Sequence, residues 1–465
     1  MVSGPKDAGG GDDGDGLRLG VRALVLVPVL TRLQDRRDAD GGVRRRLSRS
    51  PEARLEEACG LVQAIDQEIV HAEIVTVAQP RPATLFGTGR IEGFAQIVRE
   101  KGAELVVVDH PLTPVQQRNL EREFGAKVLD RTGLILEIFG RRARTKEGVL
   151  QVELAHLEYQ RGRLVRSWTH LERQRGGAGF LGGPGETQIE ADRRILQDKI
   201  TKIRRELETV RRTRDLHRAK RKKVPYPVVA IVGYTNAGKS TLFNRLTGAS
   251  VMAEDMLFAT LDPTLRRVRL PHGAIIILSD TVGFISDLPT HLVAAFRATL
   301  EEVVEADLVI HLRDISDPDT VAQAEDVEEI LSGLGVDPGD RRRVLEVWNK
   351  IDNLDDADRA RLAEDTQSLP AANRPIAVSA ITGEGTDALM AAIETHISGT
   401  LRALSVTLSA DQMPLIDWVY RHATVMQRTD HEDGGVSLDL QAPQAAADEI
   451  LERIHGRRAR EAWED

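Results

Sequence analysis

The residues with the clearest chemistry lie near the middle of the chain, at positions 233–240. They read Gly-Tyr-Thr-Asn-Ala-Gly-Lys-Ser, which matches the pattern of a loop that wraps phosphate groups. Glycines let the backbone approach the phosphates, Lys239 supplies a cation for the β- and γ-phosphates, and the Ser240 hydroxyl can bind Mg²⁺. The flanking residues predict a buried strand at 228–232 and a helix start at 240–246, which is the context that such a loop requires.

Two further segments suit a nucleotide whose terminal phosphate is cleaved. An apolar run ends in Asp280, and Gly283 follows three residues later, so a carboxylate would lie near Mg²⁺ and a glycine amide near the γ-phosphate. Upstream, the segment 258–264 contains Thr260, which could close onto the metal when nucleotide is bound. The predicted catalytic residues are Lys239, Thr260, Asp280 and Gly283, and the predicted Mg²⁺ ligands are Ser240 and Thr260.

The base is indicated by Asn-Lys-Ile-Asp at 349–352, directly after an apolar strand at 344–348. The carboxyl end of a parallel strand is where such sheets bind ligands. The Asp352 carboxylate can accept from both N1–H and the 2-amino group of guanine, and adenine offers no matching pair of donors. Asn349 would contact the base or brace the loops, while the stem of Lys350 covers the ring.

The sequence therefore predicts a GTP-binding site. Ser379 and Ala380, after a predicted strand at 376–378, would complete it by offering a backbone amide to the guanine oxygen. The predicted nucleotide contacts are Gly233, Tyr234, Thr235, Asn236, Ala237, Gly238, Lys239, Ser240 and Thr241; Phe258, Ala259, Thr260, Leu261 and Asp262; Asp280, Thr281, Val282 and Gly283; and Asn349, Lys350, Ile351, Asp352, Ser379 and Ala380.

Two side chains modify the expected chemistry. In well-known small GTPases the residue that corresponds to Phe284, directly after the glycine, is a glutamine that orients the attacking water. The phenyl ring of Phe284 cannot form a hydrogen bond to water in that role. We therefore expect slow intrinsic hydrolysis, unless Phe284 packs within the turn and another group positions the water. Asn236 can help to hold a monovalent cation against the phosphates, so we expect faster hydrolysis in K⁺ than in Na⁺.

Composition sets outer limits on the protein. With 465 residues, 41% of them hydrophobic, the chain is long enough for about three domains. Its one cysteine, Cys59, excludes an internal disulfide and a multi-cysteine metal site, and we expect it to be a buried residue of a helix. The Gly- and Asp-rich start lacks the pattern of a signal peptide, and the longest apolar stretch, 23–30, is too short to span a bilayer. We expect a soluble, cytoplasmic monomer that binds Mg²⁺ together with the nucleotide, in addition to the monovalent cation that Asn236 could hold.

Charge is distributed unevenly along the chain. Residues 141–223 hold 23 Lys and Arg against 11 Asp and Glu, a local charge of +12 in a protein of net charge −9. Within them, leucines and isoleucines recur at heptad spacing in two sets joined by a glycine-rich loop, which predicts an antiparallel helical hairpin. A helix of about 25 residues would hold this loop roughly 35 to 40 Å from its base. Arg173, Arg175 and Phe180 at the tip suit contact with RNA.

The expected fold class is α/β: a doubly wound P-loop GTPase sheet, preceded by a small α/β domain with the hairpin and followed by a small α+β domain. In the first domain we expect a largely parallel sheet and a helix at 53–68; Gly87 to Arg90 could be an anion-binding turn or a plain helix entry. In the last we expect a helix at 411–422. The predicted domain limits are 1–16 for a disordered leader, 17–145 for the amino-terminal α/β domain and 146–223 for the hairpin, whose tip is expected at 176–185. The GTPase domain is expected at 224–399 and the α+β domain at 400–465.

Four segments resemble the signatures of one family. They are Asp-Arg-Thr-Gly-Leu-Ile-Leu at 130–136, Glu-Gly-Val-Leu-Gln-Val-Glu-Leu at 147–154, Gly-Gly-Pro-Gly-Glu-Thr-Gln at 182–188 and Leu-Phe-Ala-Thr-Leu-Asp-Pro-Thr at 257–264. Together they resemble the HflX family of ribosome-associated GTPases. The resemblance implies binding to the large ribosomal subunit, with the hairpin tip near the peptidyl-transferase region, and GTP-dependent splitting or rescue of stalled ribosomes.

Carried over by position, the resemblance assigns the phosphates to 233–240, the γ-phosphate sensor to Asp280 and Gly283, and guanine to 349–352 with 379–380. Two features depart from the family pattern: the leader is an addition, and Arg90 stands where many relatives have lysine. The resemblance therefore does not imply nucleotide binding by the amino-terminal domain, which is suggested for some relatives. The alternatives are a ribosome-assembly GTPase, an NTP-dependent RNA-remodelling protein and a switch unrelated to RNA.

Overall fold

The computed structural model describes residues 20–31, 49–174, 184–221, 226–248, 258, 264–286, 297–370, 373–399 and 401–455. The predicted leader at 1–16 lies outside these residues. The chain divides into two compact units, each described by itself below. The first comprises Met1–Gln34, Pro51–Arg141 and Gly162–Leu181, and the second comprises Asp35–Ser50, Arg142–Arg161 and Gly182–Asp465.

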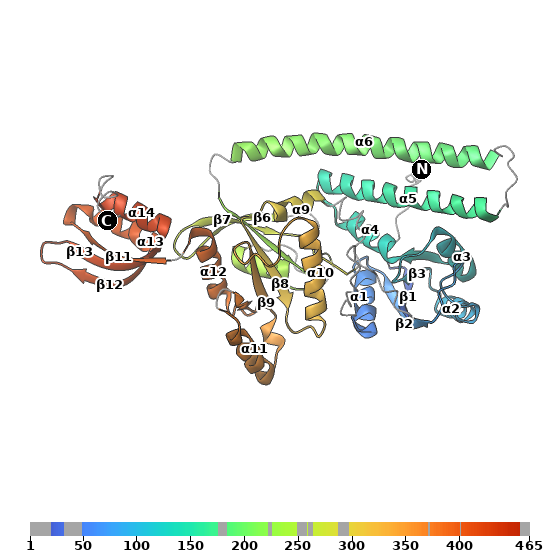
Figure 1. Cartoon of the computed structure of the whole chain (residues 1–465), viewed down its shortest axis with the longest axis horizontal. Helices are drawn as coiled ribbons and strands as arrows, with labels where there is room; N and C mark the ends of the chain where they lie inside the picture. The colour runs from blue at the N-terminus through green and yellow to red at the C-terminus, as the bar shows by residue number, and fades with distance from the viewer. Residues whose placement is uncertain are drawn as a thin grey trace, which may run out of the picture. The chain divides into compact units, whose positions relative to one another are not determined.

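The first unit is built on a four-stranded parallel sheet in the order β2-β1-β3-β4 (Figure 1). Its strands are β1 (Arg22–Leu30), β2 (Glu68–Val77), β3 (Leu105–Val108) and β4 (Lys127–Asp130), and its helices are α1 (Pro51–Gln63), α2 (Thr88–Lys101), α3 (Pro114–Phe124) and α4 (Arg131–Arg142). Apolar residues of α2 and α3 cover one face of the sheet in a single core. The predicted α/β character with a parallel sheet is confirmed.

The end of α1 differs from the prediction. A helix was expected to reach residue 68, but α1 ends at Gln63 and residue 68 already begins β2. Asp66 adopts a left-handed conformation (φ 54°), which a continuing helix does not allow. The Gln67 side chain then donates to the Ile65 carbonyl and accepts from the Val21 amide, which fixes the turn into the strand.

Charged side chains occupy the carboxyl ends of β1 and β3, where the strand order reverses and such sheets usually bind ligands. Arg131 is buried and contacts both Asp109 and Glu57. Arg54 donates to the Asp109 carboxylate at 3.1 Å and to the Pro28 carbonyl at 3.3 Å. This part of the sheet is therefore filled by ion pairs of the protein itself. At the predicted turn of 87–90, α2 begins at Thr88, and Arg90 pairs with Glu73.

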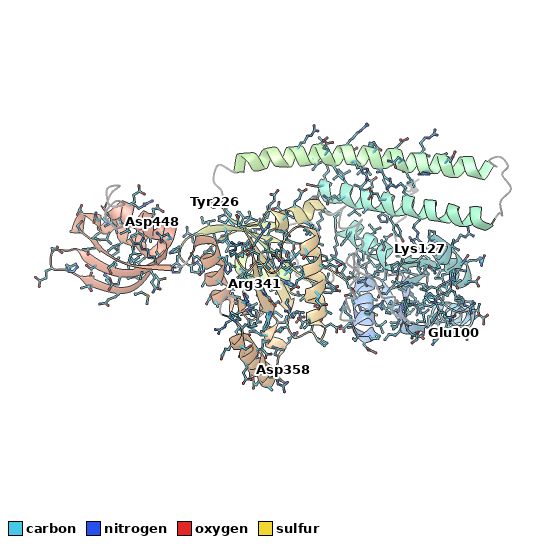
Figure 2. The ribbon with its side chains drawn as sticks, viewed as in Figure 1. Glu100, Lys127, Tyr226, Arg341, Asp358 and Asp448 are labelled. Atoms are coloured by element: carbon cyan, nitrogen blue, oxygen red, sulfur yellow. The ribbon has the colours of Figure 1, made fainter. Side chains whose placement is uncertain are left out.

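The hairpin consists of α5 (Lys146–Gln174) and α6 (Pro184–Arg221). Heptad positions of both helices pack against each other; they are Leu150, Leu154, Leu157, Leu196, Ile200, Ile203, Leu207 and Val210. Figure 2 shows other side chains of α6 projecting away from this contact. α6 begins at Pro184, inside the predicted tip of 176–185. Arg175 and Phe180 lie outside the described residues, as does the side chain of Arg173.

The second unit contains a six-stranded sheet in the order β10-β9-β8-β5-β7-β6, parallel except for β6 (Figure 1). Its strands are β5 (Val228–Gly233), β6 (Thr264–Arg269), β7 (Ile275–Asp280), β8 (Leu308–Asp314), β9 (Val344–Asn349) and β10 (Ile376–Ala377). Its helices are α7 (Lys239–Thr247), α9 (Arg297–Val304), α10 (Thr320–Gly333), η1 (Ile351–Asn353), α11 (Asp356–Ser368) and α12 (Thr386–Ser398). Helices α7 and α12 share one core with the sheet, and α9 and α10 contact β5 and β8.

A three-stranded antiparallel sheet follows, in the order β11-β13-β12. Its elements are β11 (Leu401–Leu408), η3 (Ala410–Leu415), α13 (Ile416–His422), β12 (Thr424–Asp430), β13 (Val436–Pro443) and α14 (Gln444–His455). The helix expected at 411–422 is wrong in its first half, which is a 3₁₀ segment containing Pro414, because proline lacks the N–H that an α-helical turn needs. In the part of the chain that the structure describes, no helix is long and apolar enough to cross a membrane.

Candidate functional site

The phosphate loop connects β5 to α7, and two glycines determine its shape. A Cβ atom at Gly233 would lie 2.2 Å from the Leu312 carbonyl oxygen, so no side chain fits there. Gly238 has φ 89° and precedes the first turn of α7. Asn236 is also left-handed, with φ 62°. The loop thus turns back sharply and presents the N-terminus of α7, which favours anions.

Lys239 is held inside the loop. Its side chain is 7% exposed, and its ammonium group donates to the Tyr234 carbonyl at 2.7 Å. Burial lowers the pKa of Lys239 to about 8, against the opposing effect of the Asp280 carboxylate and with a further lowering by the Lys350 cation. The loop therefore keeps a cation with few partners where phosphate oxygens would bind.

The chemistry of a Mg²⁺ site is present beside this lysine. Asp280, at the end of β7, is fully buried and accepts a hydrogen bond of 2.7 Å from the Ser240 hydroxyl. A carboxylate and a hydroxyl are oxygen donors of the kind that Mg²⁺ prefers together with phosphate oxygens. The described residues contain no cluster of three His, Cys, Asp or Glu that could hold a metal alone. These residues fit an ion bound jointly with nucleotide.

The segment after β7 is hydrogen-bonded to the phosphate loop. The Thr235 amide donates to the Phe284 carbonyl at 2.7 Å, and the Phe284 amide donates to the Gly233 carbonyl at 3.1 Å. A Cβ atom at Gly283 would lie 2.8 Å from Thr235 Cγ2, so only glycine permits this approach. The Phe284 side chain is 1% exposed and packs inside the turn. Thr281 is tied to β5 through the Ile231 carbonyl.

Asn349 joins the phosphate loop to the loop after β10. Its side-chain amide donates to the Ala237 carbonyl at 2.8 Å, and its oxygen accepts from the Ala380 amide at 3.0 Å. The side chain is 1% exposed. Of the two roles considered for Asn349, the geometry favours bracing the loops. The Ala380 amide, expected to face guanine, is engaged by Asn349 in this structure.

Asp352 lies in η1, directly after the end of β9. Its Oδ1 atom is buried and has no hydrogen-bond partner among the described residues. Because an unpaired buried carboxylate oxygen is costly, it fits a ligand that donates, as the edge of guanine does. Lys350 is left-handed (φ 65°), and its ammonium group forms an ion pair of 2.8 Å with Asp314, which fixes the direction of its stem.

The predicted segment at 258–262 is described at its first residue only. Ala259, Thr260, Leu261 and Asp262 lie outside the described residues, whereas Phe258 is described and buried. Two arginines that no sequence motif indicated also contact this region. Arg245 of α7 donates to the Ala380 carbonyl at 3.0 Å and contacts the Ile381 carbonyl. Arg49 donates to the Tyr234 hydroxyl at 2.7 Å. Neither arginine belongs to a motif, so sequence spacing could not reveal them.

Four family models match successive parts of the chain. They are described as GTP-binding GTPase N-terminal (residues 52–140), GTP-binding GTPase Middle Region (142–221), 50S ribosome-binding GTPase (228–350) and HflX C-terminal domain (366–465). A solved structure of a GTP-binding protein from Sulfolobus solfataricus in complex with GDP is 24% identical and covers 81% of this chain and 98% of its own. Its TM-score is 0.41, so the whole chains superpose only loosely.

Curated relatives match over most of their length. The GTPase HflX of Magnetococcus marinus is 47% identical over 410 residues, 88% of this chain and 92% of the relative. The GTPase HflX of Escherichia coli is 44% identical over 389 residues, 84% of this chain and 89% of the relative. The predicted resemblance, fold class and GTPase activity are confirmed by these matches. The chain therefore belongs to the HflX family of GTPases.

Proposed function

We propose that this GTPase binds the large ribosomal subunit and splits or rescues stalled ribosomes, and that the ribosome stimulates its slow intrinsic hydrolysis. The match of residues 228–350 to a family described as 50S ribosome-binding GTPase supports the partner. On this proposal the protein acts in the cytoplasm, where ribosomes are. The observation that carries the proposal is the cationic hairpin, because an acidic protein needs a separate basic surface to bind RNA.

The basic surface lies on the side of α6 away from α5. Arg194, Lys202 and Arg205 are exposed, at positions that share one face of a helix. The opposite face carries the buried residues Ile200 and Ile203. Cations in such a row match the repeated phosphates of an RNA backbone, and their contribution falls as salt rises. The described part of the hairpin is thus suited to polyanion contact even apart from its tip.

We propose that the predicted nucleotide contacts at 233–241, 258–262, 280–283, 349–352 and 379–380 form the GTP site. Lys239 binds the β- and γ-phosphates, and Gly283 presents its amide to the γ-phosphate. Ser240, Thr260 and Asp280 hold Mg²⁺, directly or through water. Held by these residues, the ion would supply positive charge that neutralises the phosphate charge.

Phe284 accounts for the slow intrinsic rate in this proposal. Its ring is buried and its backbone is bonded to the phosphate loop, so the residue after Gly283 offers no polar side chain to orient water. A ribosomal contact would complete the site. The expected result of single-turnover assays is slow hydrolysis by the protein alone and a marked acceleration by purified large subunits. A fast rate without a partner, or no stimulation by subunits, would contradict this part of the proposal.

Cosedimentation tests the partner directly. The protein is centrifuged with 50S subunits, 30S subunits and 70S ribosomes in the presence of a GTP analogue, GDP or no nucleotide. We expect binding to 50S subunits with the analogue and loss of 70S particles when splitting occurs. A variant with Arg194, Lys202 and Arg205 changed to glutamate should bind weakly. In the matched control, Arg99, Lys101 and Arg118, which are exposed on α2 and α3, are also changed to glutamate. This control variant has the same change in net charge and should bind normally.

Two outcomes would favour other functions. Association with immature particles instead of complete subunits would indicate a ribosome-assembly GTPase, which shares every nucleotide motif. Unwinding activity with ATP in a Lys239→Ala variant would indicate an RNA-remodelling protein whose hairpin is the working part. Equal sedimentation of the α6 variant and its control, with no particle bound by either, would leave the basic hairpin unexplained and point to a switch unrelated to RNA.

A further inference from the structure

Arg245 lies on the last turns of α7, away from the phosphate loop that begins this helix. Its Nε atom donates to the Ala380 carbonyl at 3.0 Å, and its Nη2 atom contacts the next carbonyl, that of Ile381. The two partners are more than 130 residues away in the sequence. One planar guanidinium thus binds two successive carbonyls of the loop that follows β10, a geometry that a lysine cannot reproduce.

This loop leaves space for the guanidinium. Gly383 has φ 91°, and a Cβ atom there would lie 3.2 Å from Arg245 Nη1. The loop is also closed on itself, because the Gly383 amide donates to the Ser379 carbonyl at 2.8 Å and the Thr382 amide donates to the Ser379 hydroxyl at 3.0 Å. Arg245 therefore contacts a compact turn from outside.

The contact with the Ala380 carbonyl fixes the direction of another group. The Ala380 carbonyl and the Ile381 N–H belong to one peptide unit, which is planar and trans, so that the two groups point in opposite directions. No cis peptide bond is present in the described chain. Holding the carbonyl therefore orients the Ile381 N–H. Asn349 holds the preceding N–H, that of Ala380, so two side chains define both ends of Ala380.

The two N–H groups of this turn are not equivalent. The Ala380 amide donates to Asn349, whereas the Ile381 amide makes no hydrogen bond with any of the described residues. A donor of fixed direction, in the loop that Asn349 joins to the phosphate loop, suits an acceptor on the base that Asp352 is proposed to bind. The carbonyl oxygen of guanine is such an acceptor, while the corresponding position of adenine carries a donor.

We propose that Arg245 is a positioning residue for guanine recognition, which orients the Ala380–Ile381 peptide so that the Ile381 N–H donates to the 6-oxygen of the base. The proposal rests on the guanine site proposed above and adds to it both the donor and the residue that aims it. Phosphate binding by the loop at 233–240 does not depend on this contact.

The test compares three diphosphates by measuring their affinities and dissociation rates. GDP and IDP both carry the 6-oxygen, whereas 2-aminopurine riboside diphosphate lacks the 6-oxygen and the N1–H and retains the 2-amino group. Arg245→Ala should weaken GDP and IDP binding roughly fivefold, the effect of a partly exposed charge-assisted hydrogen bond, and should leave 2-aminopurine riboside diphosphate unchanged. Arg245→Lys should behave like Arg245→Ala, because the forked contact is lost in both variants.

Arg359→Ala is the matched control. Arg359 also contacts this loop, through an exposed ion pair of 3.2 Å with Glu384, but does not touch the Ala380–Ile381 peptide in the described hydrogen bonds. This variant should bind all three diphosphates as the wild type does. Agreement between Arg245→Ala and the control would overturn the proposal.

Two further outcomes separate the possible failures. Equal weakening of all three diphosphates by Arg245→Ala would mean that the arginine only stabilises the loop, and would overturn the positioning role while leaving the guanine site intact. Equal binding of GDP and 2-aminopurine riboside diphosphate by the wild type would show that the 6-oxygen is not contacted. That result would overturn the guanine contact on which the proposal rests.

Discussion

Replacing Lys239 with methionine is expected to stabilise the nucleotide-free protein and to abolish nucleotide binding. The lysine is 7% exposed and its pKa is lowered, chiefly by burial, from 10.5 to about 8. A buried ammonium group is costly unless it is paired. Methionine has a similar length and carries no charge, so it removes this cost while preserving most of the packing.

The two pKa values give the size of the effect. A difference of about 2.5 between the folded and unfolded pKa, at about 1.4 kcal/mol per pKa unit, corresponds to about 3 kcal/mol. Because the folded pKa is the lower one, the cost is fully present below pH 8 and disappears as the pH rises through 10.5. At pH 9.5 about 1.4 kcal/mol should remain. The folded pKa already includes the attraction to Asp280, so only the loss of the hydrogen bond to the Tyr234 carbonyl, about 1 kcal/mol, offsets the gain, and we expect about 2 kcal/mol at pH 7.

Amide hydrogen exchange in β5 and β8 measures the free energy of opening of this domain alone, which a multi-domain melting curve does not. Wild type and Lys239→Met are compared without nucleotide at pH 7 and pH 9.5, and the advantage of the variant should shrink at the higher pH. Lys199→Met, on the exposed surface of α6, is the control and should change stability by less than about 0.5 kcal/mol.

After addition of Mg²⁺ and GDP, wild type should be more stable than Lys239→Met. Ligand binding stabilises only the protein that can bind it, so wild type gains protection and the methionine variant does not. A Lys239→Met variant that is less stable than wild type at pH 7 without nucleotide would refute the proposed cost of the buried ammonium group, as would a stability difference that is the same at both pH values.

Three other predictions concern the nucleotide site. Asn349→Ala leaves two buried backbone groups without partners, which at about 1 kcal/mol each should destabilise the nucleotide-free domain by about 2 kcal/mol; amide hydrogen exchange in β5 and β8 measures this change, and an unchanged stability would show that the bridge is unimportant. Asp352→Asn should lose preference for GDP and gain affinity for xanthosine diphosphate, whose 2-oxo group accepts from the new amide; a competition assay that still favours GDP would exclude Asp352 as the base reader. Asn236 predicts faster hydrolysis in K⁺ than in Na⁺ at equal ionic strength, and equal rates would count against a monovalent cation there.

The central strands of the nucleotide-binding sheet could be predicted from the sequence to within about one residue. β5 is buried on both faces and therefore reads as a continuous apolar run, whereas in β9 the half-buried Glu346 interrupts the apolar residues. The edge strands β6 and β12 were not predicted, because their residues are largely polar and exposed. Their pairing depends on neighbouring strands and not on their own composition.

Some residues of the candidate site could likewise be predicted from the sequence, and others could not. The phosphate loop and the base reader are short motifs whose chemistry depends on neighbouring residues, so their positions follow from the sequence. Arg245 acts on Ala380 from 135 residues away, and the choice of Asn349 as a brace depends on Ala237, 112 residues away. Contacts of this kind form only when the strands and helices are assembled, and no local sequence pattern indicates them.

The length of α6 gives small rotations a large reach. Its 38 residues correspond to about 57 Å of helix at 1.5 Å per residue. A turn of about 5° at the carboxyl end, which precedes the strand leading into the phosphate loop, would move the amino end by about 5 Å if the helix stays straight. That displacement exceeds the spacing of about 3.4 Å between stacked bases. A rearrangement at the carboxyl end that is too small to alter the core would therefore displace the far end of the helix by more than the spacing between two stacked bases.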